Sequence, residues 1–142
     1  MLDRRSSKHG VGMPVDWEIR DSILIITVIG HGDHEPIGAI AEAINDPEFR
    51  PGISLLFDMR LSTDSPTGNK SRERVALLTP LREKGISSRC AIVVGPLAHQ
   101  YGLARMAGAY ADLKGWQLQI FTDKDEALGW LTVASDLEPE AK

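Results

Sequence analysis

The chain has 142 residues, of which 42% are hydrophobic and 25% are charged. This length is expected for one domain, and the apolar fraction is too high for a disordered chain. Acidic residues outnumber basic ones, 20 to 16, and the resulting net charge of −4 argues against nucleic-acid binding through a basic face. The only cysteine is Cys90. One cysteine forms no internal disulfide, which indicates a reducing compartment.

The two ends of the chain are predicted to be flexible tails, residues 1–12 and an acidic segment at 132–142, around one domain at 13–131. The polar N-terminal segment lacks the apolar stretch of a secretory signal. The longest apolar run, Ile23–Ile29, is far shorter than the roughly 20 residues that span a bilayer. The sequence therefore predicts a cytoplasmic protein without a transmembrane segment.

The first two elements are predicted to form a β-hairpin. Residues 15–20 alternate between apolar and charged side chains, which indicates a strand at the edge of a sheet with one wet face. The continuous apolar run at 23–29 is typical of a strand that is buried on both faces. Asp21 and Ser22 lie between the two runs and provide the turn.

Helices and strands then alternate to the end of the domain. The spacing of apolar residues predicts a helix ending at Ile44, followed by a buried strand at 53–57 that ends on Asp58. It then predicts a helix from Val75 to Gly85, which Pro80 interrupts with Thr79 as a cap, and a buried strand at 90–94. A helix at 103–113, a strand at 116–121 and a helix that Thr122 or Asp123 begins complete the domain. The order β-β-α-β-α-β-α-β-α predicts an α/β fold. Its five-stranded sheet is mixed but mostly parallel, with an antiparallel N-terminal edge strand.

Three segments resemble the SpoIIAA-like family, which groups with STAS domains and is related in some classifications to CRAL-TRIO lipid carriers. They are Ala91–Pro96, Tyr101–Ala107 and Phe121–Leu131, and the resemblance extends over residues 13–131. It implies a SpoIIAA/STAS-like sheet with its parallel strands in sequential order and helices packed along it. It implies no established chemistry.

A ligand site is expected where the carboxyl ends of the parallel strands meet, as in other open α/β sheets. The candidate residues there are Asp58, Arg60, His99, Tyr101 and Arg105. We favour an ion pair between Arg105 and Asp58 that holds strand to helix. The alternative is an anion site in which Arg105, Arg60 and the start of the helix receive a phosphate or carboxylate. Apolar residues near this edge would suit the lipid-like ligand that the lipid-carrier kinship suggests, although leucine and methionine at such places are more often core residues.

Two further segments have a functional alternative beside an ordinary loop. His31 and His34 have metal-ligand spacing, but no cysteine or helical histidine motif supports a zinc site, so a solvated loop is favoured. The segment Asp64–Gly68 is similar to the phosphorylated loop of STAS anti-sigma-factor antagonists, with Pro66 inserted. In that alternative the protein is a regulatory interaction module phosphorylated at Ser65.

The sequence contains no nucleophile elbow, phosphate-binding loop or dinucleotide fingerprint after a strand. We therefore expect a non-enzymatic module without a cofactor, which binds or senses a small anionic or lipid-like ligand. The alternating edge strand at 15–20 makes a homodimer plausible.

Overall fold

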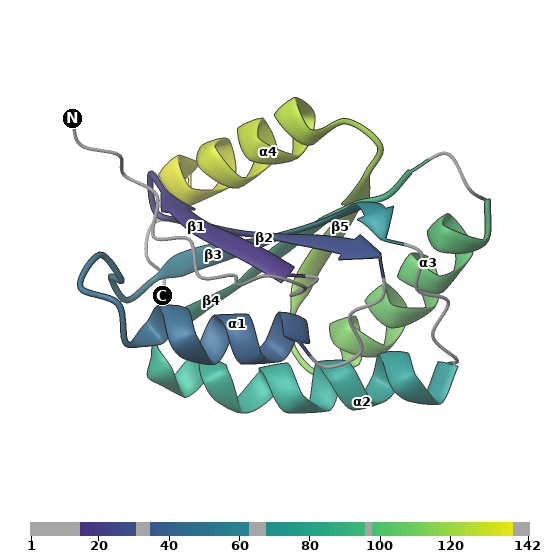
Figure 1. Cartoon of the computed structure of the whole chain (residues 1–142), viewed down its shortest axis with the longest axis horizontal. Coiled ribbons are helices and arrows are strands. Elements are labelled where there is room, and N and C mark those ends of the chain that lie inside the picture. The colour runs from purple at the N-terminus through teal and green to yellow at the C-terminus, as the bar shows by residue number, and fades with distance from the viewer. Residues whose placement is uncertain (1–14, 31–34, 63–67, 96–97, 138–142) are drawn as a thin grey trace.

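The computed structural model describes residues 15–30, 35–62, 68–95 and 98–137. It shows one five-stranded sheet flanked by helices (Figure 1). The elements in chain order are β1 (Val15–Arg20), β2 (Ile23–Gly30), α1 (Glu35–Ile44), β3 (Ile53–Ser62), α2 (Gly68–Leu78), the short 3₁₀ helix η1 (Thr79–Lys84), β4 (Ile86–Val93), α3 (Ala98–Leu113), β5 (Gln117–Phe121) and α4 (Lys124–Leu137).

The sheet has the predicted topology. Its strands lie in the order β1-β2-β3-β4-β5, so every strand pairs with the one before it in the chain. β1 is antiparallel to β2, and the other three pairings are parallel. The predicted α/β fold with an antiparallel edge strand is confirmed.

The hairpin between β1 and β2 has an unusual turn. Both turn residues have a positive φ, 51° at Asp21 and 68° at Ser22, which is the pattern of a type I′ turn. This turn matches the twist of the strands but favours asparagine and glycine. The hairpin is fixed by the next strand, because the backbone N–H of Ser54 donates to the carbonyl of Ser22 at 3.0 Å.

Replacing Ser22 by glycine is expected to raise the free energy of unfolding by about 1 kcal/mol, because glycine adopts a positive φ without steric cost. Urea denaturation followed by circular dichroism measures this change. The control is Ser87→Gly in β4, at a position without a positive φ, where glycine is expected to destabilise the protein by weakening the strand and by removing the hydroxyl that accepts from the backbone N–H of Arg89 at 3.1 Å. A stability loss at Ser22 as large as at Ser87 would contradict a strained turn.

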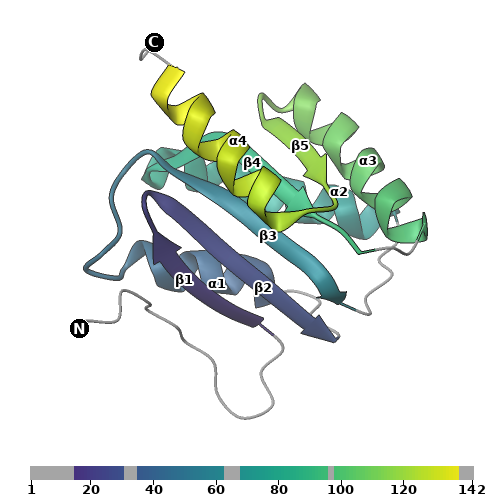
Figure 2. The same ribbon diagram turned by 90° about the horizontal axis from the view of Figure 1, so that it is seen from above.

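The helices divide unequally between the two faces of the sheet. Helices α1, α2 and α3 lie on one face, and α4 lies alone on the other (Figures 1 and 2). Right-handed crossovers explain the first arrangement, because three crossovers that advance in the same direction across a sheet place their helices on one side. Helix α4 follows the last strand and is not a crossover.

The larger core cluster fills the space between the sheet and helices α1 to α3. It includes Trp17 of β1, whose indole N–H donates to Glu42 of α1 at 3.0 Å. On β2 and β3 its members alternate along the strand, for example Leu24 and Leu55, which are fully buried. This cluster accounts for the buried face that the alternation at 15–20 predicts.

A smaller cluster lies under α4. Ala127 and Leu131 of the helix pack on strand residues that include Ile25, Leu56 and Ala91. At the margin of this cluster, the rings of Phe121 and Trp130 make a tilted contact with their centroids 5.9 Å apart. Leu55 and Leu56 thus belong to different clusters, as expected for neighbours in a strand buried on both faces.

Several elements are longer than the sequence predicts. β3 continues past Asp58 to Ser62, β4 begins at Ile86, and α4 continues to Leu137, beyond the predicted domain limit at 131. These extensions contain polar residues, so a prediction based on apolar runs does not include them. Thr79 does not cap a second helix as predicted, because its hydroxyl donates to the carbonyl of Val75 at 2.8 Å.

Candidate functional site

Asp58 is a buried carboxylate near the carboxyl end of β3. Its side chain is only 5% exposed. Leu56, two residues earlier, belongs to the cluster under α4, whereas Phe57 faces the other core. Because side chains alternate along a strand, Asp58 lies on the α4 face of the sheet. It is the one acidic side chain among the described residues that is buried.

An irregularity in β3 brings Arg60 back onto Asp58. Thr27 pairs with Asp58 and Ile29 pairs with Leu61, so three residues of β3 span a distance that β2 covers with two. Such a bulge leaves an extra residue outside the ladder. The backbone N–H of Arg60 donates to Oδ1 of Asp58 at 3.2 Å instead.

The side chain of Arg60 makes a two-pronged contact with the same carboxylate. Its Nε donates to Oδ1 at 2.9 Å and its Nη2 donates to Oδ2 at 2.8 Å. This geometry uses one edge of the guanidinium, and Nη1 has no hydrogen-bond partner among the described residues. The Arg60 side chain is 42% exposed, so its remaining donors face solvent.

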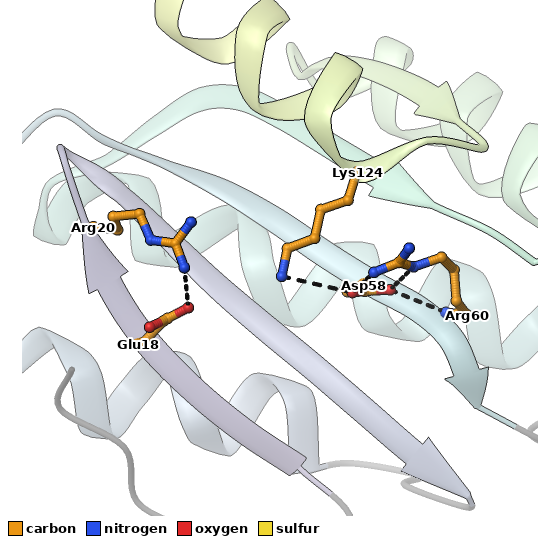
Figure 3. A network of polar contacts seen from close by, with 5 residues as sticks. All are labelled: Glu18, Arg20, Asp58, Arg60 and Lys124. Carbon is orange, nitrogen blue, oxygen red and sulfur yellow. Dashed lines mark hydrogen bonds and ion pairs between the residues drawn. The ribbon is translucent and has the colours of Figure 1, made fainter.

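Lys124, the first residue of α4, approaches Asp58 from the other side (Figure 3). Its Nζ lies 3.9 Å from Oδ2, which is the oxygen that Arg60 Nη2 also contacts. Two cations therefore meet at a single carboxylate oxygen. We call Asp58, Arg60 and Lys124 the Asp58 cluster; its formal charge is positive.

The electrostatics of the cluster favour the ionised carboxylate. Burial raises the pKa of Asp58, but the hydrogen bonds from Arg60 and the charges of Arg60 and Lys124 outweigh burial and hold this pKa below its ordinary value of 3.8. The hydrogen bond to Asp58 raises the pKa of Arg60, and the charges of Asp123 and Asp125 also raise it. Asp58 and Arg60 thus both stay charged at neutral pH, with two further acids within electrostatic range of Arg60.

Two exposed apolar side chains stand immediately beyond the cluster. Ile29 and Leu61 are register partners at the carboxyl ends of β2 and β3, and they are 49% and 61% exposed. Their pairing follows directly after that of Thr27 with Asp58. An apolar pair therefore adjoins the two cations at the strand ends. Helix α4 packs on β3, β4 and β5, and it leaves this end of β2 uncovered in the described structure (Figure 2).

The favoured ion pair between Asp58 and Arg105 is wrong. The carboxylate is held by Arg60 and Lys124, and Arg105 is an exposed residue of α3. The physical reason is the face of the sheet, because α3 lies on the side opposite to that of Asp58 (Figure 1). Of the predicted site, the structure therefore brings together Asp58 and Arg60, and adds Lys124.

Other predicted residues lie outside the described part of the structure. His99 and Tyr101 belong to α3, but their side chains are not described. His31, His34 and Ser65 fall in the ranges 31–34 and 63–67, also outside the described residues. The thiol of Cys90, in contrast, lies in the described structure. Burial raises its pKa to about 12, so Cys90 is a packing residue rather than a nucleophile.

Comparison with known proteins identifies the fold. No protein-family profile and no curated protein match the sequence. A solved structure does match: an uncharacterised protein of the DUF3478 family with a SpoIIAA-like fold, from Shewanella loihica PV-4. The two chains are 20% identical with a TM-score of 0.53, and the match covers 82% of this chain and 91% of the other.

The chain therefore has a SpoIIAA-like fold, as the resemblance of its three segments implies. At this level of identity the similarity extends to the fold alone. No helix among the described residues is long and apolar enough to span a membrane.

Proposed function

We propose that the protein is a binding module, rather than an enzyme, for a small amphipathic carboxylate such as a fatty acid. The observation that carries the proposal is the juxtaposition of two cations at Oδ2 of Asp58 with the exposed pair Ile29 and Leu61. The cations would bind the head group, and the apolar pair would contact the chain.

The charges around the cluster favour a monoanion. Arg60 presents an open guanidinium nitrogen, and Lys124 contributes an ammonium group at the start of a helix, where an anion is also stabilised. Asp123 and Asp125 act on Arg60 from the same region. These acids disfavour a phosphate dianion more strongly than a carboxylate, because repulsion grows with the charge of the ligand.

Binding of dodecanoate to the full-length protein tests the proposal, with displacement of a fluorescent fatty acid as the readout. Arg60→Gln is expected to weaken binding at least about tenfold, since it removes a charge-assisted contact to the carboxylate. Arg20→Gln is the matched control. Arg20 is exposed on β1 and pairs with Glu18 at 2.9 Å, apart from the cluster (Figure 3), so binding should be unchanged.

Two probes separate the head group from the chain. Dodecanol lacks the charge and acetate lacks the chain, and both are expected to bind much more weakly than dodecanoate. Equal binding of dodecanol would eliminate the role of the cations, and equal binding of acetate would eliminate that of Ile29 and Leu61. Native mass spectrometry without a bound species, together with no displacement by dodecanoate, would refute the function.

A further inference from the structure

A cleft lies at the other end of the sheet, where the parallel strands begin. It has a volume of about 340 Å³, within the range of roughly 300–1,000 Å³ that is usual for small-molecule sites. The β1–β2 turn forms one wall, and the segment between α1 and β3 forms the other. The lining residues are Ile19, Asp21, Ser22, Pro47, Glu48 and Arg50. None of them belongs to the Asp58 cluster.

Asp21 places a carboxylate on the first wall. The residue is exposed, and its side chain has no hydrogen bond or ion pair among the described residues. Its backbone is held by the turn, because Ser22 next to it accepts a hydrogen bond from β3. The cleft thus has a negatively charged hydrogen-bond acceptor, which the fold holds in place but which makes no hydrogen bond or ion pair with another described residue.

Arg50 places a guanidinium on the second wall. Its Nη1 donates to the carbonyls of Pro47 and Phe49 at 2.9 and 3.0 Å, which ties the side chain to its own loop. The edge formed by Nε and Nη2 has no partner among the described residues. Such an edge binds a carboxylate through two parallel hydrogen bonds.

The two walls therefore carry opposite charges that do not neutralise each other. The carboxylate of Asp21 repels a simple anion, so an anion alone is disfavoured in the cleft. A ligand that satisfies both walls needs a cation for Asp21 and a carboxylate for Arg50. We propose that this cleft binds a small zwitterion of the α-amino acid class.

Titration of the ¹⁵N-labelled full-length protein with L-leucine tests the proposal. The amide signals of residues 19–22 and 48–50 are expected to shift, with a dissociation constant on the order of 1 mM for a small, open site. N-acetyl-L-leucine lacks the ammonium group and L-leucinamide lacks the carboxylate. Each is expected to bind at least about tenfold more weakly, because one wall is left unpaired.

Two substitutions remove one wall each. Asp21→Asn and Arg50→Gln are expected to reduce leucine binding at least about tenfold, whereas Arg20→Gln, next to the cleft but outside its lining, leaves it unchanged. The same spectra report whether each variant is folded. If Arg50→Gln is not folded, Arg50→Lys tests the two-pronged contact instead. Absence of shifts at these residues, or equal shifts from the blocked compounds, overturns the proposal. Failure of dodecanoate to bind would not overturn this proposal, because the two sites share no residue.

Discussion

Replacing Leu131 by alanine is expected to lower the free energy of unfolding by about 2–5 kcal/mol. Leu131 is fully buried in the smaller core cluster with Ala127, and Leu128 and Trp130 of the same helix pack against the cluster. Removing its branched side chain leaves a cavity between the helix and the sheet. Urea denaturation, followed by circular dichroism, measures the loss.

The matched control for this prediction is Leu113→Ala in α3. Leu113 is 80% exposed, so the same change in chemistry is expected to alter stability by no more than about 0.5 kcal/mol. If the two substitutions lower the free energy of unfolding equally, the packing of α4 on the sheet does not depend on Leu131. The Leu131 variant should also bind dodecanoate more weakly, because Lys124 is positioned by the same helix.

Asp58→Asn is expected to lower the free energy of unfolding by about 1–3 kcal/mol near neutral pH, since it removes charged hydrogen bonds from a buried group. The pKa of Asp58 in the folded protein is lowered from 3.8. A carboxyl group whose pKa is lowered by folding stabilises the protein above its unfolded pKa. This stabilisation is lost as the pH falls through the folded pKa.

The stability gap between the parent protein and Asp58→Asn should therefore narrow as the pH falls below about 4. Urea denaturation near pH 7 and at successive acidic pH values measures this gap. Asp112→Asn is the control, because Asp112 is exposed on α3 and its side chain has no partner among the described residues. A gap that stays constant into acid would show that the charge of Asp58 is not what stabilises the fold.

The fold was predictable because its signals are local. The alternation at 15–20, the apolar runs of β2 and β3 and the helical spacing between them each reflect one element, and the order of elements determines the sheet. Element ends were less predictable. The last residues of β3 and the first of β4 mix polar or charged side chains with apolar ones, and they extend their strands through ladder pairing that an apolar run does not report.

The candidate site was predictable only in part. Asp58 and Arg60 follow a buried apolar run, which marks them as lying at a strand end. The predicted partner of Asp58 is wrong because Arg105 belongs to α3, which lies on the opposite face of the sheet. Leu56 and Asp58 share a face by alternation, and the helix after the last strand covers that face, so Lys124 could have been found. The bulge that turns Arg60 onto Asp58 had no signal in the sequence.

The sequential order of the strands has a consequence for how the chain folds during synthesis. Each new strand adds beside the one just completed, beginning from the β1–β2 hairpin, so no strand waits for a partner that is still to be made. Helix α4 comes last, and the apolar side chains beneath it stay exposed to solvent until it docks. We expect the nascent chain to be most prone to aggregation in that interval, after β5 has paired and before α4 has closed the second core.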